Sequence, residues 1–192
     1  MSLPRTPLKR IMAMPRLWWH AKGYGVHSPS AYRYVRSVVH ERLHYYAYSR
    51  VDKLAREASM SRRTARLLMR AGLWEQSDVA VCEGVRPQVR EIVTAWSSEA
   101  KTTEKWAEGC RMMVVGGEKN GENDVLTAVE RVMRQGGTIV LLDADKRTGA
   151  ARTVLDRMLA QENRPGVLMT DGRSAIMHVE PGVPGQYYEM LL

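Results

Sequence analysis

Three short, largely apolar runs, each followed by glycine or an acidic residue, organise the second half of the chain. They are Val79–Cys82, Met112–Val115 and Thr138–Leu142. Unbroken apolar runs of this length are typical of parallel strands that are buried on both faces. Because a segment with apolar residues at helical spacing follows each run, the pattern predicts strands that alternate with helices around a parallel sheet.

The helices between these strands are expected to begin near Pro87 and to span Asn123–Arg134 and Arg147–Gln161. Further on, two apolar runs, Val167–Thr170 and Ser174–Val179, flank an Asp-Gly pair. Asp-Gly between two such runs is a strong turn signal, so the sequence predicts a hairpin here. The last residues, 186–192, are expected to add an edge strand.

The first half of the chain predicts helices only. Ser28 and Pro29 suit the N-cap and the first position of a helix that carries apolar residues as far as Leu43. Two shorter helices are expected at Ser49–Ala58 and Ser61–Arg70, with Gly72 as the stop after the second. The arginines of the second helix are expected on its outer surface, and a helix-turn-helix over residues 52–70 remains an alternative interpretation.

Charge divides the chain into two parts. Residues 1–73 hold fifteen Lys and Arg against three acids, whereas residues 74–192 hold fourteen against eighteen, which together give the net charge of +8. We therefore expect a basic helical N-terminal extension over 1–73 and a Rossmann-like domain over 74–192. The basic part can attract nucleic acid, anionic lipid or an acidic protein partner, or it can pack onto the acidic domain.

The candidate site lies at the carboxyl ends of the three strands, where ligands bind in open α/β sheets. The residues in these turns are Glu83 and Gly84, then Gly116 and Glu118, then Asp143 and Asp145. Cys82 and Cys110 give neither a disulfide framework nor a metal-ligand spacing, so no metal is expected. No apolar stretch is long enough to span a bilayer and no signal peptide is recognisable, so we expect a cytoplasmic protein.

Residues 23–32, GYGVHSPSAY, followed by Tyr45-Tyr46-Ala47-Tyr48, carry a family resemblance. This part resembles the N-terminal extension of bacterial class I S-adenosylmethionine-dependent methyltransferases of the O-methyltransferase-like kind. The resemblance implies a Rossmann-like, methyltransferase-type α/β sheet with a helical N-terminal extension. It also implies that Gly84 is the first glycine of the cofactor loop, that Gly116 ends the family's fourth strand and that Asp143 ends its fifth.

Three departures from the family pattern affect the cofactor site. Val85 and Arg86 follow Gly84 where the family has small residues, and Gly116 stands where it has an aspartate, although Glu83 or Glu118 can substitute. The polar residues 97–111 leave little room for the second strand, which carries the ribose-binding acid in the family. We therefore expect a sheet reduced in strand number.

The expected function is a methyltransferase-like protein with a degenerate site for S-adenosylmethionine. Its transferase activity would be weak or absent, with Asp143 or Asp145 near the reacting group of an unidentified small acceptor. The alternative is a non-catalytic binding module, a pseudoenzyme, that uses the basic surface of residues 1–73. The sequence leaves open whether the chain is an enzyme.

Overall fold

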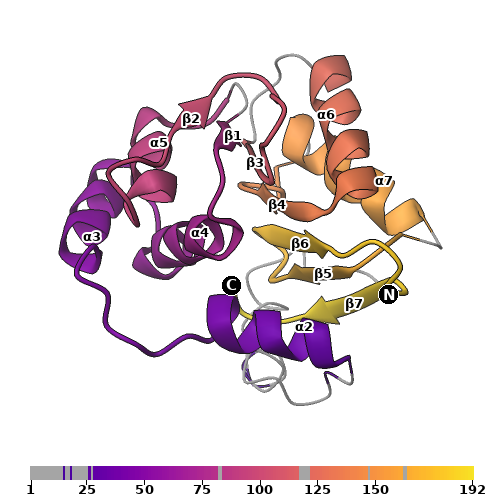
Figure 1. Ribbon diagram of the computed structural model, residues 1–192, viewed down its shortest axis with the longest axis horizontal. Helices are drawn as coiled ribbons and strands as arrows, with labels where there is room; N and C mark the ends of the chain where they lie inside the picture. The colour runs from indigo at the N-terminus through magenta and orange to yellow at the C-terminus, as the bar shows by residue number, and fades with distance from the viewer. Residues whose placement is uncertain are drawn as a thin grey trace.

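The computed structural model describes residues 15, 18, 26, 28–81, 84–116, 122–146, 148–161 and 164–192. These residues form a mixed α/β fold around one sheet of seven strands, in the order β2-β1-β3-β4-β6-β5-β7 (Figure 1). None of the helices described is both long and apolar enough to cross a bilayer.

The three strands predicted from the apolar runs are adjacent and parallel. They are β1 (Val79–Val81), β3 (Met112–Val115) and β4 (Gly137–Leu141). Every residue of β3 and β4 is buried, because helices cover both faces of the sheet. The central place of β4, between β3 and an antiparallel neighbour, confirms the prediction for this strand.

The C-terminal hairpin is confirmed as well. Strand β5 (Val167–Thr170) pairs antiparallel with β6 (Ala175–Val179), and β6 also pairs antiparallel with β4. Strand β7 (Gln186–Glu189) pairs parallel with β5 and forms the edge of the sheet. Strand β6 therefore lies between β4 and β5 and runs opposite to both.

The expected loss of the second strand is wrong. A two-residue strand, β2 (Thr102–Thr103), pairs parallel with β1 at the other edge of the sheet. Both threonines are partly exposed, and the pairing comes from backbone hydrogen bonds alongside β1. The strand carries no apolar run because it buries little side-chain surface.

Alternate residues of the central strands face two separate cores. On one side, α6 (Glu122–Gln135) and α7 (Ala150–Ala160) pack on Met113, Ile139 and their neighbours. On the other side, α3 (Tyr48–Glu57), α4 (Arg62–Glu75) and α5 (Pro87–Thr94) share a core with Met112 and Val140 (Figure 1). Helix α7 begins at Ala150, three residues later than expected.

The first long helix is shorter than predicted. Ser28 caps α2 (Pro29–Tyr34) by accepting a hydrogen bond from the backbone of Ala31, as expected, and the helix continues as a π-helix, η1 (Val35–Val39). Leu43 lies beyond this helix with 66% of its surface exposed. The glycines of the resembling motif, residues 23 and 25, lie outside the described residues.

Arg70 points inward, in contrast to the outer face expected for it. Its Nε donates to the carbonyl of Val38 at 2.6 Å, and Nη1 donates to the Tyr48 hydroxyl at 3.0 Å. The carbonyls at the C-terminal end of η1 have no partner within the helix, and the buried guanidinium supplies one. Because Arg70 binds carbonyls on another element, helical spacing alone gave the wrong face.

Gly72 does not stop α4. The helix runs on to Glu75 and ends at Gln76, which adopts a left-handed conformation at φ 49°. A Cβ on Gly72 would lie 2.4 Å from the backbone oxygen of Val93. The glycine therefore allows α4 and α5 to pack closely, and residue 73, where we expected the N-terminal extension to end, lies inside a helix.

Candidate functional site

A pocket of about 390 Å³ lies at the carboxyl ends of β1, β3 and β4. The turns after these strands contribute Gly84, Gly116 and Asp143, and the first turn of α4 and the β5–β6 turn close it from the other side. Its apolar lining includes Val85, Val89 and Leu142. This volume falls in the range of small-molecule sites.

Four of the six predicted site residues can be placed. Gly84, Gly116 and Asp143 line the pocket, whereas Asp145 is exposed and does not line it. Glu83 and Glu118 lie outside the described residues. The structure therefore brings together the residues at the ends of three strands and separates Asp145 from them.

Asp143 is held by two cations. Its Oδ2 lies 3.1 Å from the Nζ of Lys146, and its Oδ1 lies 3.8 Å from Nη2 of Arg173. The Asp143 backbone is left-handed at φ 53°, an uncommon conformation for a residue other than glycine, and it turns the chain directly after β4. These two ion pairs fix the position of the carboxylate at the edge of the pocket.

The turn after β1 touches the end of β3 through backbone alone. Gly84 adopts φ 83°, and a Cβ on Gly116 would lie 2.1 Å from the Gly84 carbonyl oxygen. Only glycine fits at position 116 in this arrangement. This contact explains why an aspartate cannot occupy the end of β3 while the Gly84 turn stays where it is.

One acid that we did not predict as a site residue, Glu104, directly follows β2. The register pairs Ala80 with Thr103, so Glu104 comes next to the end of β1. Its side chain is 82% exposed, and Oε1 lies 3.6 Å from Nη2 of Arg90 on α5. An exposed ion pair of this kind contributes about 0–1 kcal/mol, so the carboxylate is available to a ligand. The only sequence signal was an acid in a polar segment.

Four cations are among the described residues that line the pocket. They come from separate elements: Arg63 from α4, Arg86 from the β1–α5 turn, Lys146 from the segment after β4 and Arg173 from the β5–β6 turn. Partial burial lowers the pKa of the Arg63 guanidinium, and nearby Asp171 opposes this shift. Arginine stays protonated at neutral pH even so.

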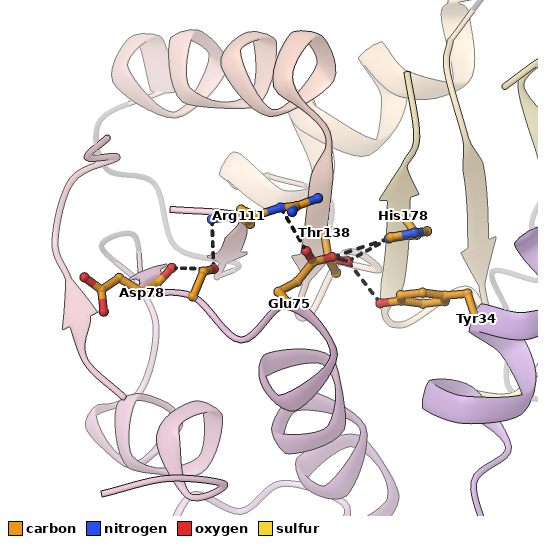
Figure 2. Close-up of polar contacts among 7 residues, drawn as sticks. Tyr34, Glu75, Asp78, Arg111, Thr138 and His178 are labelled. Carbon is orange, nitrogen blue, oxygen red and sulfur yellow. Dashed lines mark hydrogen bonds and ion pairs between the residues drawn. The ribbon is translucent and has the colours of Figure 1, made fainter. Parts of the chain in front are cut away.

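A second polar cluster lies at the opposite, amino end of the sheet (Figure 2). Thr138, the second residue of β4, donates from Oγ1 to Oε1 of Glu75 at 2.6 Å. The Tyr34 hydroxyl and the Nδ1 of His178 each lie 3.2 Å from the same Oγ1. Arg111 reaches Glu75 from the outside, with Nε 3.6 Å from Oε2.

The hydroxyl of Thr138 fixes the direction of these bonds. It has one proton, which goes to Glu75, so Tyr34 and His178 must both donate to it. Burial raises the pKa of the Tyr34 phenol far above its usual range, against the opposing effect of the Thr138 hydrogen bond, so Tyr34 remains a donor. The Tyr34 and His178 rings stack at 4.2 Å. The cluster anchors α2, α4, β4 and β6 to one another.

Exposed aromatic and basic side chains gather between α2 and α3. Tyr46 is fully exposed at 107% and Leu43 at 66%, and the nearby side chains of Arg33, Arg36 and Arg42 are exposed as well. In contrast, Arg66 is paired with Asp52 by two hydrogen bonds of 2.9 and 2.7 Å. Residues 32–46 therefore form an exposed surface that carries both aromatic and basic side chains.

The described residues contain no group of three or more His, Cys, Asp or Glu that could hold a metal ion. Cys110 is buried and free, and Cys82 lies outside the described residues.

Comparisons of the chain with models of protein families, with curated proteins and with solved structures gave no match. Its function is therefore inferred from the residues of the site and from the resemblance in residues 23–48.

Proposed function

We propose that this chain is a class I S-adenosylmethionine-dependent methyltransferase-like protein with a reduced donor site, so that it binds the cofactor weakly and has low transferase activity. The observation that carries the proposal is Glu104. It follows the second strand of the sheet, beside the glycine turn of the first strand, where the family has its ribose-binding acid.

The order of the strands supports the Rossmann-like, methyltransferase-type assignment. Strands β2, β1, β3 and β4 lie side by side and parallel, and antiparallel β6 separates β4 from β5. This order agrees with the resemblance of residues 23–48, which implies strands that alternate with helices and a final hairpin.

The residues around the turn fit the cofactor in part. The Glu104 carboxylate would accept hydrogen bonds from the ribose hydroxyls, and the backbone of Gly84 would approach the methionine part. Two features weaken the fit: Val85 stands next to Gly84, and the Gly84 carbonyl packs against Gly116. If the two features together cost one charge-assisted contact, binding weakens by about 10- to 100-fold, and a family-like micromolar dissociation constant rises to roughly 10–100 µM.

When bound, S-adenosylmethionine would supply a methyl group that passes to a nucleophilic atom of the acceptor, while the electron pair of the breaking C–S bond stays on sulfur. The pocket would contribute mainly by holding the acceptor in line with that bond. Asp143 lies in the pocket and is paired with Lys146 and Arg173, so we assign it the role of orienting an acceptor.

Calorimetric titration of the full chain with S-adenosylmethionine and S-adenosylhomocysteine tests the proposal. We expect dissociation constants of roughly 10–100 µM, weakened by about tenfold or more in Glu104→Gln. Glu108→Gln removes an exposed acid from the same segment and should bind like the wild type. Equal affinities in Glu104→Gln and Glu108→Gln, or no binding at millimolar cofactor, would contradict the assignment of the donor site.

The exposed surface at residues 32–46 favours a second candidate function, a non-catalytic binding module. Exposed Tyr46 and Tyr32 can stack on unpaired bases while Arg33, Arg36 and Arg42 approach the phosphates. Titration with single-stranded oligonucleotides at several salt concentrations tests this alternative. It predicts an affinity that falls as the salt concentration rises and that Tyr46→Ala lowers. An affinity that changes with neither salt nor this substitution would argue against it.

A further inference from the structure

The described side chains that line the pocket include more cations than acids. Arg63, Arg86, Lys146 and Arg173 stand among them beside two carboxylates, Asp143 and Asp171. Asp143 already holds Lys146 and Arg173, as described above. All four cations are exposed, so they form a charged rim around a floor of glycine backbone and apolar side chains.

The two remaining arginines are positioned by main-chain carbonyls. Arg63 donates from Nη2 to the carbonyl of Leu191 at 3.0 Å, and Arg86 donates from Nη1 to the carbonyl of Ala58 at 2.5 Å. A carbonyl carries no net charge, so both guanidinium groups keep their positive charge uncompensated by these contacts. A guanidinium has five N–H donors, and one such bond orients it while others can serve a ligand.

The N-terminus of α4 adds to the same field. Ser61 caps this 14-residue helix, its Oγ accepting from the backbone of Thr64 at 3.0 Å, and both residues line the pocket. The first turn contains no acidic residue and carries Arg62 and Arg63 instead. The partial positive charge of the helix end is therefore directed at the pocket together with the side-chain cations.

We propose that this pocket binds a small organic anion, through a carboxylate or phosphate group held by Arg63 and Arg86, with its apolar body on Val85, Val89 and Leu142. The inference rests on the proposed function to the extent that this anion is the methyl acceptor. S-adenosylmethionine itself does not match the pocket, because its sulfonium and ammonium groups give it a net positive charge. The two ligands therefore occupy neighbouring parts of the same end of the sheet. Glu104 would bind S-adenosylmethionine, and the cations would bind the anion.

Titration of the full chain with phenyl phosphate, benzoate and the neutral phenol tests the inference. Phenyl phosphate and benzoate should bind at least about tenfold more tightly than phenol, since only they offer charge-assisted hydrogen bonds. The two anions also distinguish a phosphate site from a carboxylate site. Arg63→Gln and Arg86→Gln should each weaken binding of the preferred anion by about tenfold.

Arg50→Gln is the matched control. It removes the same charge from an exposed ion pair with Glu91 on the helical layer and leaves the pocket intact, so its affinity should equal that of the wild type. Thermal melting of each variant without ligand verifies that it is folded. Phenol binding as tightly as the anions, no binding of either anion, or an equal loss of affinity in Arg50→Gln would overturn the inference.

The same preparation titrated with S-adenosylmethionine separates this inference from the proposed function. Cofactor binding without anion binding overturns the anion site alone. Anion binding without cofactor binding supports the anion site and contradicts the donor site at Glu104.

Discussion

Thr138→Val should destabilise the protein strongly, although it keeps the shape of the side chain. The Thr138 side chain is fully buried, and its hydroxyl lies within hydrogen-bonding distance of Glu75, Tyr34 and His178. The substitution removes a charge-assisted hydrogen bond of about 1.5–3 kcal/mol. It also leaves the buried Tyr34 and the partly buried His178 without this acceptor. His178 can still reach Glu75, with Nδ1 3.4 Å from Oε1, so part of the loss is recovered. We expect a decrease of about 3–4 kcal/mol in the free energy of unfolding.

Urea unfolding followed by circular dichroism measures this change. Tyr34→Phe removes one donor but leaves no buried acceptor unpaired, so it should cost only about 1 kcal/mol. In the double variant the two effects should fall short of additive by about 1 kcal/mol, since both remove the same bond. Thr94→Val is the control, because its partly exposed hydroxyl only bonds back to the carbonyls of its own helix. A loss below about 1 kcal/mol in Thr138→Val would refute the role of this cluster.

Two further substitutions test the packing and the charge of the helical layer. Gly72→Ala should lower the free energy of unfolding in urea by about 2–3 kcal/mol, because the added Cβ meets the Val93 carbonyl. In the control Gly182→Ala the added Cβ meets no atom within 4 Å, so this variant should show only the strain of its positive φ. Similar losses in the two variants would contradict close packing of α4 on α5. Asp52→Asn should cost about 1 kcal/mol or less at pH 7. The hydrogen bonds from Arg66 lower the pKa of Asp52, so its contribution is present above the pKa of the unfolded chain and is lost as pH falls through the folded value. Unfolding curves measured across acid pH should therefore converge for wild type and variant, and a difference that persists at pH 2 would contradict this origin.

Apolar periodicity predicted the centre of the sheet because β3 and β4 are buried on both faces, which leaves an unbroken apolar signal. It failed for β2, whose two threonines pair through backbone and bury little. It also failed for Gly72 and Arg70, because a glycine that ends a helix and one that allows close packing look alike in sequence. An arginine on an outer face likewise has the same helical spacing as one that serves a buried carbonyl.

The two polar sites differed in how far the sequence could reveal them. The pocket was predictable because strand ends carry local signals, such as Gly84 and Asp143. Its cations were not, since Arg63 and Arg173 lie far apart in the sequence and meet only through the fold. The buried cluster had no local signal either. Its members are 63, 40 and 104 residues from Thr138 in the sequence.

Helix α4 joins these two sites, because Arg63 in its first turn lines the pocket and Glu75 at its end enters the buried cluster. Adding or deleting one residue between them would rotate one end by about 100° and shift it by about 1.5 Å relative to the other. No such change can keep both side chains in place. Length variation in this protein should therefore be confined to the connecting loops, and the distance in sequence between Arg63 and Glu75 should be as constrained as either residue.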